Sequence, residues 1–262
     1  MNVALHGATG RMGAAIVALI RAGDDRIVGA AAAPGCADLR RDLGEVHGLA
    51  TVGVEVQDDV SSAILGADVI LDFSHASAFA NLMRHAVRAK VPVVSGTTGL
   101  EAAAIAALDD SARSIPVLWA PNFSLGIHVL AELVRHAVSR LGEGFDVEIV
   151  ETHHRAKADA PSGTALRLAQ AAQAAREGLS LVHGREGMVG ARPLNALGML
   201  AMRGGDVVGD HTVHLLGLGE RLELTHRATS REVFARGAMF AARAILKRPP
   251  GRYGLGDILP GA

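Results

Sequence analysis

The sequence predicts an α/β protein in which a parallel sheet is followed by a smaller α+β region. Two patterns and one bulk property support this prediction. Up to about residue 121, short β-branched runs alternate with alanine-rich stretches of helical length, and beyond that point the alternation becomes irregular. Of the 262 residues, 49% are hydrophobic, which is enough to bury a sizeable core.

The first half of the chain reads as alternating strands and helices. Strands are expected at residues 2–6, 26–30, 69–73, 92–95 and 117–120. The intervening segments 12–22, 77–89 and 101–113 carry apolar residues at helical spacing. Because parallel strands need crossover connections, this order predicts a parallel sheet covered by helices on both faces.

The second half changes character near residues 123–124, where we expect a domain boundary. Helices are expected at 127–141 and 162–176, and strands at 146–152, 207–215 and 222–225. A last helix, 233–246, is followed by Pro249, Pro250 and Gly251, which end it. This mixed order predicts an α+β domain that begins at residue 124.

Charge and cysteine content narrow the classes of partner. Lysine and arginine (26) nearly balance aspartate and glutamate (27), so no global field attracts nucleic acid or an anionic membrane. The apolar runs are too short to span a bilayer, and residues 1–7 lack the features of a signal peptide. With Cys36 as the single cysteine, we expect a cytoplasmic protein that binds no membrane and no nucleic acid.

A glycine-rich turn follows the first expected strand and opens the first helix. Gly7, Gly10 and Gly13 have the spacing GxxGxxG, a variant of the dinucleotide-binding fingerprint of Rossmann-type domains. Such a turn directs backbone amides and the positive end of a helix dipole toward phosphates. A structural turn without a ligand is the alternative, but its place at the first strand–helix junction favours cofactor binding.

The choice between NADH and NADPH stays open in the sequence. After the second strand, where an acidic residue usually binds the adenosine ribose, the chain has Ala32 and Ala33. The nearest charged side chains are Arg11 in the glycine turn and Asp38, Arg40 and Arg41 further along the loop.

Two further loops follow expected strands, at the sheet edge where open α/β proteins bind ligands. Residues 95–99 and 120–124 offer glycine, hydroxyl and amide groups suited to a nicotinamide carboxamide and ribose. Ordinary turns, with Thr98 or Ser124 as helix caps, are the alternative for each loop. Three such loops at successive strand ends favour one shared site.

The densest chemistry lies in residues 151–165. An expected strand ends at His153 and His154, a basic loop carries Lys157, and Ser162 stands where a helix begins. A lysine beside a helix start suits a carboxylate or phosphate, and a histidine there exchanges protons near neutral pH. The alternatives are a solvated basic loop with Ser162 as cap, or a metal site. Neighbouring histidines alternate across a strand and no HxExH or cysteine pair accompanies them, so we expect no metal.

This segment resembles the signature E-x-H-H-x-x-K-x-D-A-P-S-G-T-A of 4-hydroxy-tetrahydrodipicolinate reductases. Other segments agree in order, and the resemblance covers residues 3 to about 259. They are residues 7–13, 72–74, 96–99, 122–126, 185–187 and 219–226. The resemblance implies a Rossmann-type dinucleotide-binding domain, residues 1–123 completed by about 234–262, and a second domain, residues 124–233, that binds substrate and builds a homotetramer. It also implies reduction of a cyclic imine dicarboxylate, made from aspartate semialdehyde and pyruvate, by NADH or NADPH on the diaminopimelate route to lysine.

The resemblance further implies roles for individual residues. His153 matches the family's proton donor and acceptor, and Lys157 its second proton donor. The substrate contacts matched are His154, Gly163 and Thr164. The cofactor contacts matched are Gly7, Ala8, Thr9, Gly10, Arg11, Met12, Gly96, Thr97, Thr98, Ala120, Pro121, Asn122 and Phe123.

The chain departs from the family locally. Many members carry an acid and an arginine where Ala32 and Ala33 stand, and His75 follows the Asp-Phe-Ser motif, where it could meet a bound cofactor. The other histidines are expected to be packed or surface residues. Two rival functions are another Rossmann oxidoreductase of the aspartate group and a catalytically silent nicotinamide-binding module. Neither accounts for a signature in which both His153 and Lys157 are kept.

Overall fold

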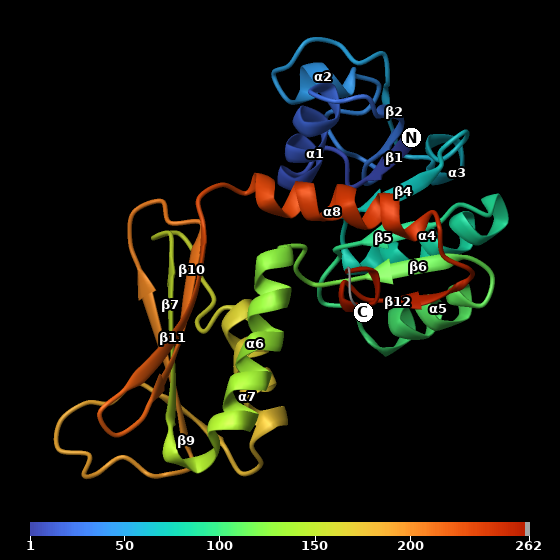
Figure 1. Ribbon diagram of the computed structural model, residues 1–262. Helices are drawn as coiled ribbons and strands as arrows, with labels where there is room; N and C mark the ends of the chain where they lie inside the picture. The colour runs from blue at the N-terminus through green and yellow to red at the C-terminus, as the bar shows by residue number, and fades with distance from the viewer. Residues whose placement is uncertain (260–262) are drawn as a thin grey trace. The chain divides into compact units, whose positions relative to one another are not determined.

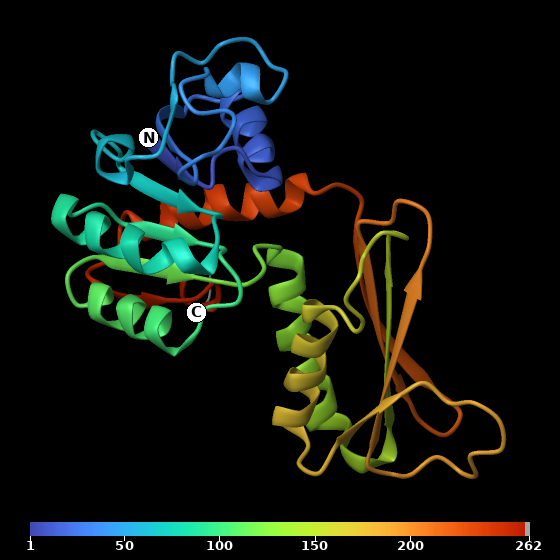
Figure 2. The ribbon, with the colours of Figure 1, turned by 180° about the vertical axis from the view of Figure 1, so that it is seen from behind.

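The computed structural model describes residues 1–259 and contains two compact units (Figures 1 and 2). The first unit comprises Met1–Phe123 and the chain from Glu232 onward, and the second comprises Ser124–Arg231. The chain therefore leaves the first unit once and comes back to it. Each unit has its own sheet and its own hydrophobic core.

The first unit is built on a wholly parallel sheet, as predicted, with seven strands where the sequence indicates five. In spatial order the strands are β12 (Gly251–Tyr253), β6 (Pro116–Trp119), β5 (Val93–Ser95), β4 (Val69–Asp72), β1 (Asn2–His6), β2 (Arg26–Ala31) and β3 (Val56–Gln57). Strand order reverses at β1, which pairs with β2 on one side and β4 on the other. Ligands of open α/β sheets bind at the carboxyl ends of strands beside such a switch point.

Helices cover both faces of this sheet. They are α1 (Arg11–Arg21), α2 (Leu43–Val46), α3 (Val60–Ala63), α4 (Ala76–Ala89), α5 (Ala102–Ala112) and α8 (Glu232–Ile245), followed by a short 3₁₀ turn, η2 (Gly256–Ile258). Helices α1 and α8 pack together on one face, and α4 and α5 pack together on the other (Figures 1 and 2). The α4–α5 side buries Leu82, Met83 and Leu108 against strand residues Ile70 and Val93.

The second unit packs two helices on one face of a five-stranded mixed sheet (Figure 1). The strand order is β11 (Arg221–Ala228), β10 (Gly209–Leu216), β7 (Asp146–His153), β9 (Ala196–Arg203) and β8 (Ser180–His183). The helices are α6 (Leu125–Leu141), which leads into the 3₁₀ turn η1 (Gly142–Gly144), and α7 (Gly163–Ala175). Val147, Ile149 and Val213 point toward these helices and are fully buried. Because side chains alternate across a strand, Glu151 and His153 lie on this same face of β7.

Several elements differ from the sequence prediction. β10 starts at Gly209 and β11 spans Arg221–Ala228, whereas 207–215 and 222–225 are expected. The pattern also misses the short elements α2, α3, β3 and β12 and the edge strand β8. The most consequential omission is β9, which reads ALGMLAMR and has neither β-branched residues nor alternation. Pairing with β7 and β8 on its two sides makes it a strand, so tertiary context overrides local propensity.

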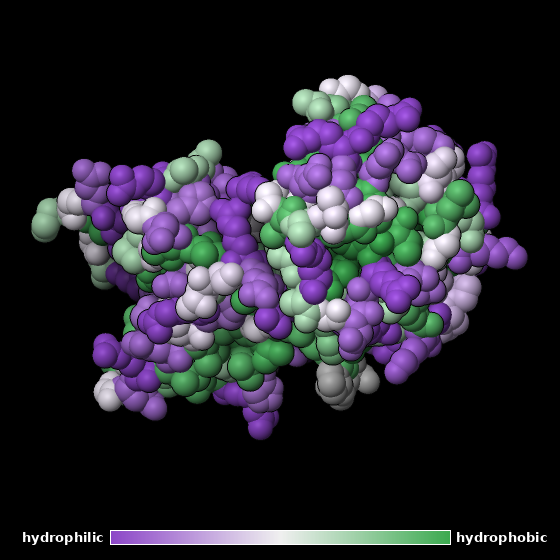
Figure 3. Space-filling model, turned by 90° about the horizontal axis from the view of Figure 1, so that it is seen from above, coloured by the Kyte–Doolittle hydropathy of each residue, from purple (hydrophilic) through white to green (hydrophobic). Residues whose placement is uncertain are grey.

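Among residues 1–259, no helix combines the length and apolar character needed to cross a membrane. In the space-filling view of Figure 3, apolar residues reach the surface in patches that hydrophilic residues interrupt.

Candidate active site

The glycine turn is held at the carboxyl end of β1 by contacts that leave no room for side chains. Gly7 has a φ of +75°, and a Cβ on it would lie 2.5 Å from the carbonyl oxygen of Phe73. A Cβ on Gly13 would lie 2.0 Å from the carbonyl oxygen of Ala8. The first contact brings the turn against the end of β4, and the second brings α1 against the turn.

The start of α1 is open to an anion. No side chain caps Gly10, whereas Asp42, Ser124 and Ser162 cap α2, α6 and α7. The first-turn amides of a helix lack partners within the helix, so α1 presents N–H groups and a positive dipole end beside the glycine turn. Pyrophosphate is the group that this geometry fits.

Buried Asp72 ties together the ends of three neighbouring strands, two of which, β1 and β5, lead into predicted cofactor loops. Its carboxylate accepts hydrogen bonds from His6 Nδ1 (2.8 Å), Ser74 Oγ (2.6 Å), Ser95 Oγ (2.6 Å) and Thr97 Oγ1 (2.8 Å). Burial raises the pKa of Asp72, but the hydrogen bond and charge of His6 and the serine hydroxyls outweigh it and lower the pKa overall. The ends of β1, β4 and β5 are therefore held around one carboxylate.

An aromatic cavity of about 230 Å³ lies beside these loops. The Phe73 and Phe123 rings meet edge to face, with centroids 5.5 Å apart. A Cβ on Gly96 would lie 2.2 Å from Cε1 of Phe73, so glycine is needed for this packing. The cavity is lined by Met12, Phe73, Gly96, Pro121, Asn122, Phe123 and Phe234. Five of these residues were predicted to bind cofactor, while Phe73 and Phe234 were not.

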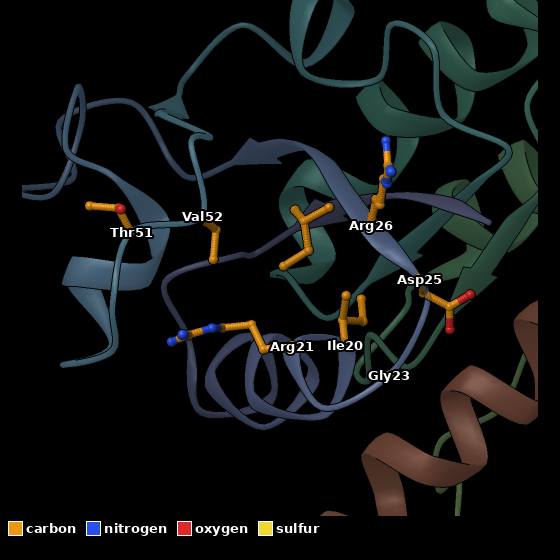
Figure 4. Close-up of a pocket in the computed structure, with 8 residues that line it drawn as sticks. Ile20, Arg21, Gly23, Asp25, Arg26, Thr51 and Val52 are labelled. Carbon is orange, nitrogen blue, oxygen red and sulfur yellow. The ribbon is translucent and has the colours of Figure 1, made fainter.

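A larger cavity, about 340 Å³, lies at the amino-terminal end of β2 (Figure 4). Its charged residues are Arg21, Asp25 and Arg26, and Asp25 already pairs with the terminal amine of Met1 and with Arg243. The cavity lies beside the first residues of β2 and the end of α1, away from the carboxyl ends of the strands. Position therefore favours the smaller aromatic cavity as a binding site.

The second unit holds a buried polar cluster at the end of β7. Fully buried Glu151 accepts a hydrogen bond from Nδ1 of His153 and two from Arg203, whose Nη2 and Nη1 lie 2.9 and 3.1 Å from Oε1 and Oε2. The backbone N–H of Ser162 donates to Oε1 at 3.0 Å. Burial raises the pKa of Glu151, but these hydrogen bonds outweigh it and keep the carboxyl ionised.

Strand pairing brings two more histidines to this region. His211 and His226 pair in register across β10 and β11, and His211 pairs with Glu151 on β7. Each of these two histidines shares a hydrogen bond with a serine that caps a helix. Nε2 of His211 lies 3.2 Å from Oγ of Ser162, and Nε2 of His226 lies 3.2 Å from Oγ of Ser124. The helix starts are thereby fixed to the sheet.

Glu151, His153 and His211 bring donor atoms within 4.8 Å of one another, a grouping that the sequence interpretation did not weigh as a metal site. A cation there would have to displace Arg203 and the Ser162 amide, which already donate hydrogen bonds to both carboxylate oxygens of Glu151. The arrangement favours proton exchange at an imidazole over metal binding.

The loop after β7 places the predicted lysine in an ion pair. Lys157 Nζ lies 2.7 and 2.9 Å from the two carboxylate oxygens of exposed Asp159. His154 is half-buried, with Nε2 3.3 Å from Arg231 Nη2. Exposed Gly163 and half-buried Thr164 begin α7, directly after the Ser162 cap. The second unit thus groups all five predicted catalytic and substrate-binding residues at one end of its sheet.

Two family models match the chain. The model described as dihydrodipicolinate reductase, N-terminus, matches residues 1–123, and the model for the C-terminus of that reductase matches residues 126–259. The chain belongs to the dihydrodipicolinate reductase family. A protein named 4-hydroxy-tetrahydrodipicolinate reductase from Anaeromyxobacter sp. (strain Fw109-5) is 47% identical over 99% of this chain and 97% of its own. One of the same name from Myxococcus xanthus is 44% identical over 99% and 97%.

Solved structures agree with this family assignment. Dipicolinate-bound dihydrodipicolinate reductase from Paenisporosarcina sp. TG-14 superposes with a TM-score of 0.76 at 26% identity, covering 99% of both chains. An amine dehydrogenase from Mycobacterium smegmatis, 15% identical with a TM-score of 0.61, shares the fold. As a member of the dihydrodipicolinate reductase family, the chain is a nicotinamide-dependent oxidoreductase, which confirms the function class predicted from the motifs.

Sequence reasoning missed several polar contacts in the two units. His6 and His211 are packed, as expected, but each also joins a buried hydrogen-bond network, and half-buried His226 bonds the Ser124 cap. Arg203 was missed altogether because its strand, β9, was missed. The register of β10 against β7 is the signal that would have found His211, and a single sequence does not reveal that register.

His211 makes stability depend on pH. Burial, and then the charge of His153, lower its pKa to about 4, whereas an unfolded histidine titrates near 6.5. The unfolded chain therefore binds a proton that the folded chain refuses, and we expect about 3 kcal/mol of unfolding free energy to be lost as pH falls from about 6.5 to about 4. Urea unfolding of wild type and His211→Gln at pH 8 and 5 measures this loss, which should be smaller in the variant. His183→Gln, an exposed histidine of the same unit, is the control. Equal losses in all three proteins would exclude His211 as the cause.

Proposed function

We propose that this protein reduces 4-hydroxy-tetrahydrodipicolinate to tetrahydrodipicolinate in diaminopimelate and lysine biosynthesis in the cytoplasm. The substrate gains a hydride from NADH or NADPH and a proton, and its hydroxyl group leaves as water. The observation that carries the proposal is the buried Glu151–His153 pair beside the Lys157 loop and the start of α7. A dicarboxylate needs cationic and N–H donors, and a ring that gains hydride needs a proton. The family relatives that bear this name cover nearly the full chain.

The first unit, residues 1–123 with the returning C-terminal segment, is proposed to hold the nicotinamide cofactor. The glycine turn and uncapped α1 suit its phosphates, and the aromatic cavity suits its nicotinamide ring. The cofactor supplies a hydride. Within the second unit, Lys157 and the α7 start at Gly163 and Thr164 bind the substrate carboxylates, His154 contributes a further contact, and His153 donates the proton.

The test is a coupled assay in which the substrate is generated from aspartate semialdehyde and pyruvate, and loss of reduced nicotinamide absorbance is followed. Restored growth without diaminopimelate, in a strain lacking the reductase, is the matching test in cells. A folded protein that binds cofactor but shows no turnover would favour the rival of a silent nicotinamide-binding module.

NADPH is expected to bind at least as tightly as NADH. Ala32 presents no carboxylate to repel a 2′-phosphate, and Arg11 is exposed beside the turn, whereas Arg41 is drawn into an ion pair with Asp38. Ala32→Asp should weaken NADPH by about tenfold and leave NADH nearly unchanged. Calorimetric titration of both proteins measures the four affinities. Tighter binding of NADH by more than tenfold in the wild type would contradict the expectation.

Lys157→Ala is expected to raise KM and lower kcat, each by about tenfold, since a charged hydrogen bond contributes roughly 1.5–3 kcal/mol. Arg155→Ala is the matched control, because it removes one positive charge from an exposed position of the same loop. Steady-state kinetics with thermal melting separates the two. Parallel changes in both variants would reduce Lys157 to part of a general positive field.

A homotetramer is proposed to form through the open face of the second sheet. Helices cover one face of this sheet. Leu200 and Met202 of β9 lie on the other face, beside Val150 and Thr152 of β7, and are 38% and 53% exposed. Light scattering after chromatography should give four chains for the wild type and fewer for Met202→Glu.

A further inference from the structure

We propose that Glu151 is the positioning residue that keeps a proton on Nδ1 of His153, so that His153 exchanges its catalytic proton through Nε2. The inference rests on the proposed function for the catalytic step, but the protonation of each nitrogen is a property of the protein alone. It names the residue, and the atom, that set the direction of proton transfer.

The hydrogen bonds of Glu151 leave one role for Nδ1. An ionised carboxylate only accepts, so Nδ1 of His153 must donate to Oε2. Arg203 is an obligate donor to both oxygens, and the Ser162 amide is an obligate donor to Oε1. These donors hold both carboxylate oxygens, so the imidazole ring is oriented by a group that is itself fixed.

The other ring nitrogen lies beside a glycine. A Cβ on Gly209 would lie 3.0 Å from Nε2 of His153 and 3.5 Å from Cε1 of His211. The His211 ring meets His153 edge to face, with centroids 5.1 Å apart. Glycine at 209 therefore keeps a methyl group away from the nitrogen that must exchange a proton.

The charges around His153 set its protonation. Burial lowers the pKa of His153 most strongly, Glu151 raises it by hydrogen bond and charge, and Lys157 and Arg203 lower it. His211, on the neighbouring strand, stays neutral near pH 7. Among these groups, Glu151 alone favours the imidazolium. In the acid step the Nε2–H bond breaks, the proton goes to the substrate, and neutral imidazole remains with its proton on Nδ1.

Glu151→Gln should reverse this arrangement. The amide NH₂ of glutamine cannot face Oε1's two donors, the Ser162 amide and Arg203, without two donor–donor contacts. If the NH₂ group instead takes the place of Oε2, it faces only one obligate donor, Arg203 Nη1, together with Nδ1 of His153. Nδ1 can accept a hydrogen bond once the ring moves its proton to Nε2. The variant should therefore move the neutral proton of His153 to Nε2 and disfavour the imidazolium.

The experiment combines ¹⁵N NMR of the imidazole nitrogens with kinetics on the full-length chain. The His153 signals are assigned as those lost in His153→Gln. At alkaline pH, wild-type His153 should carry its proton on Nδ1, and Glu151→Gln should carry it on Nε2. The kcat of Glu151→Gln should fall by about 10²-fold or more. The alkaline limb of its pH–rate profile should move to lower pH, because the charge that favours imidazolium is gone. Glu151→Asp should recover part of the rate.

Glu148→Gln is the matched control. Glu148 lies on the opposite face of the same strand and, like Glu151, is held by arginine, in its case by Arg185 and Arg192, each at 2.8 Å. It should lose comparable ion pairs with no change in the tautomer of His153 or in the pH profile. A wild-type proton on Nε2 would overturn the proposal even if Glu151→Gln fails to fold, as would a variant with an unchanged profile. A wild type with the Nδ1 proton but no turnover would instead count against the proposed function.

Discussion

Replacing His153 with glutamine is expected to lower kcat by roughly 10²–10⁴-fold, the usual contribution of a positioned general acid. Glutamine keeps a hydrogen-bonding side chain at the end of β7 but has no proton that titrates near neutral pH. Dissociation constants for NADH and NADPH should remain within about twofold, because the loops assigned to the cofactor all belong to the first unit.

Steady-state kinetics and cofactor titration on the same preparation measure both effects. His183→Gln, an exposed histidine of the same unit, should keep kcat within about twofold and so controls for the substitution itself. A folded His153→Gln protein with nearly wild-type kcat would remove His153 from the catalytic role. A loss that only follows a lowered Tm would assign the residue to stability instead.

Gly7→Ala is expected to weaken dinucleotide binding by about 10²-fold, or roughly 3 kcal/mol. Two costs add at this position. Alanine pays about 1–2 kcal/mol for the left-handed backbone, and its Cβ would lie 2.5 Å from the carbonyl oxygen of Phe73. Relief of that contact moves the turn off the end of β4, and with it the amides of the phosphate site.

Gly66→Ala separates the two costs. Gly66 has nearly the same φ, +74°, yet nothing lies within 4 Å of an added Cβ. It should lower Tm modestly and leave cofactor affinity unchanged, as calorimetry and thermal melting will show. Equal loss of affinity in both variants would mean that backbone strain, and not the contact with Phe73, sets the effect.

The strands and the glycine turn of the first unit could be predicted from the sequence because the patterns that mark them are local. β-branched runs alternate with alanine-rich stretches of helical length, and the pattern predicts five of the seven strands of this sheet within one residue of their observed bounds. The short edge strands β3 and β12 were missed. The glycine spacing also predicts a cofactor turn without knowledge of its neighbours. Local spacing likewise predicts His153, Lys157 and the Ser162 helix start, since all lie within one short segment.

The parts that were missed depend on register. Arg203 reaches Glu151 only because β9 pairs in parallel with β7, and His211 reaches Ser162 only because β10 pairs in antiparallel fashion on the other side. Neither pairing leaves a local mark: β9 has no alternation, and a histidine in β10 looks like any other. Asp72 lies in one of the segments that resemble the family, but its place at the centre of four side chains arises only where parallel strand ends come together.

The return of the chain to its first unit has a consequence for synthesis. A nascent chain has made β1 to β6 long before α8 and β12 leave the ribosome, with the whole second unit translated in between. Until then the sheet lacks α8, whose own residues Ala238, Met239 and Ile245 are buried in the finished protein. The edge of β6 also has no partner strand. The half-made protein thus displays an apolar face and a free strand edge, both of which favour association with other chains. Completion of the first unit therefore waits until α8 and β12 have been made, after the whole second unit.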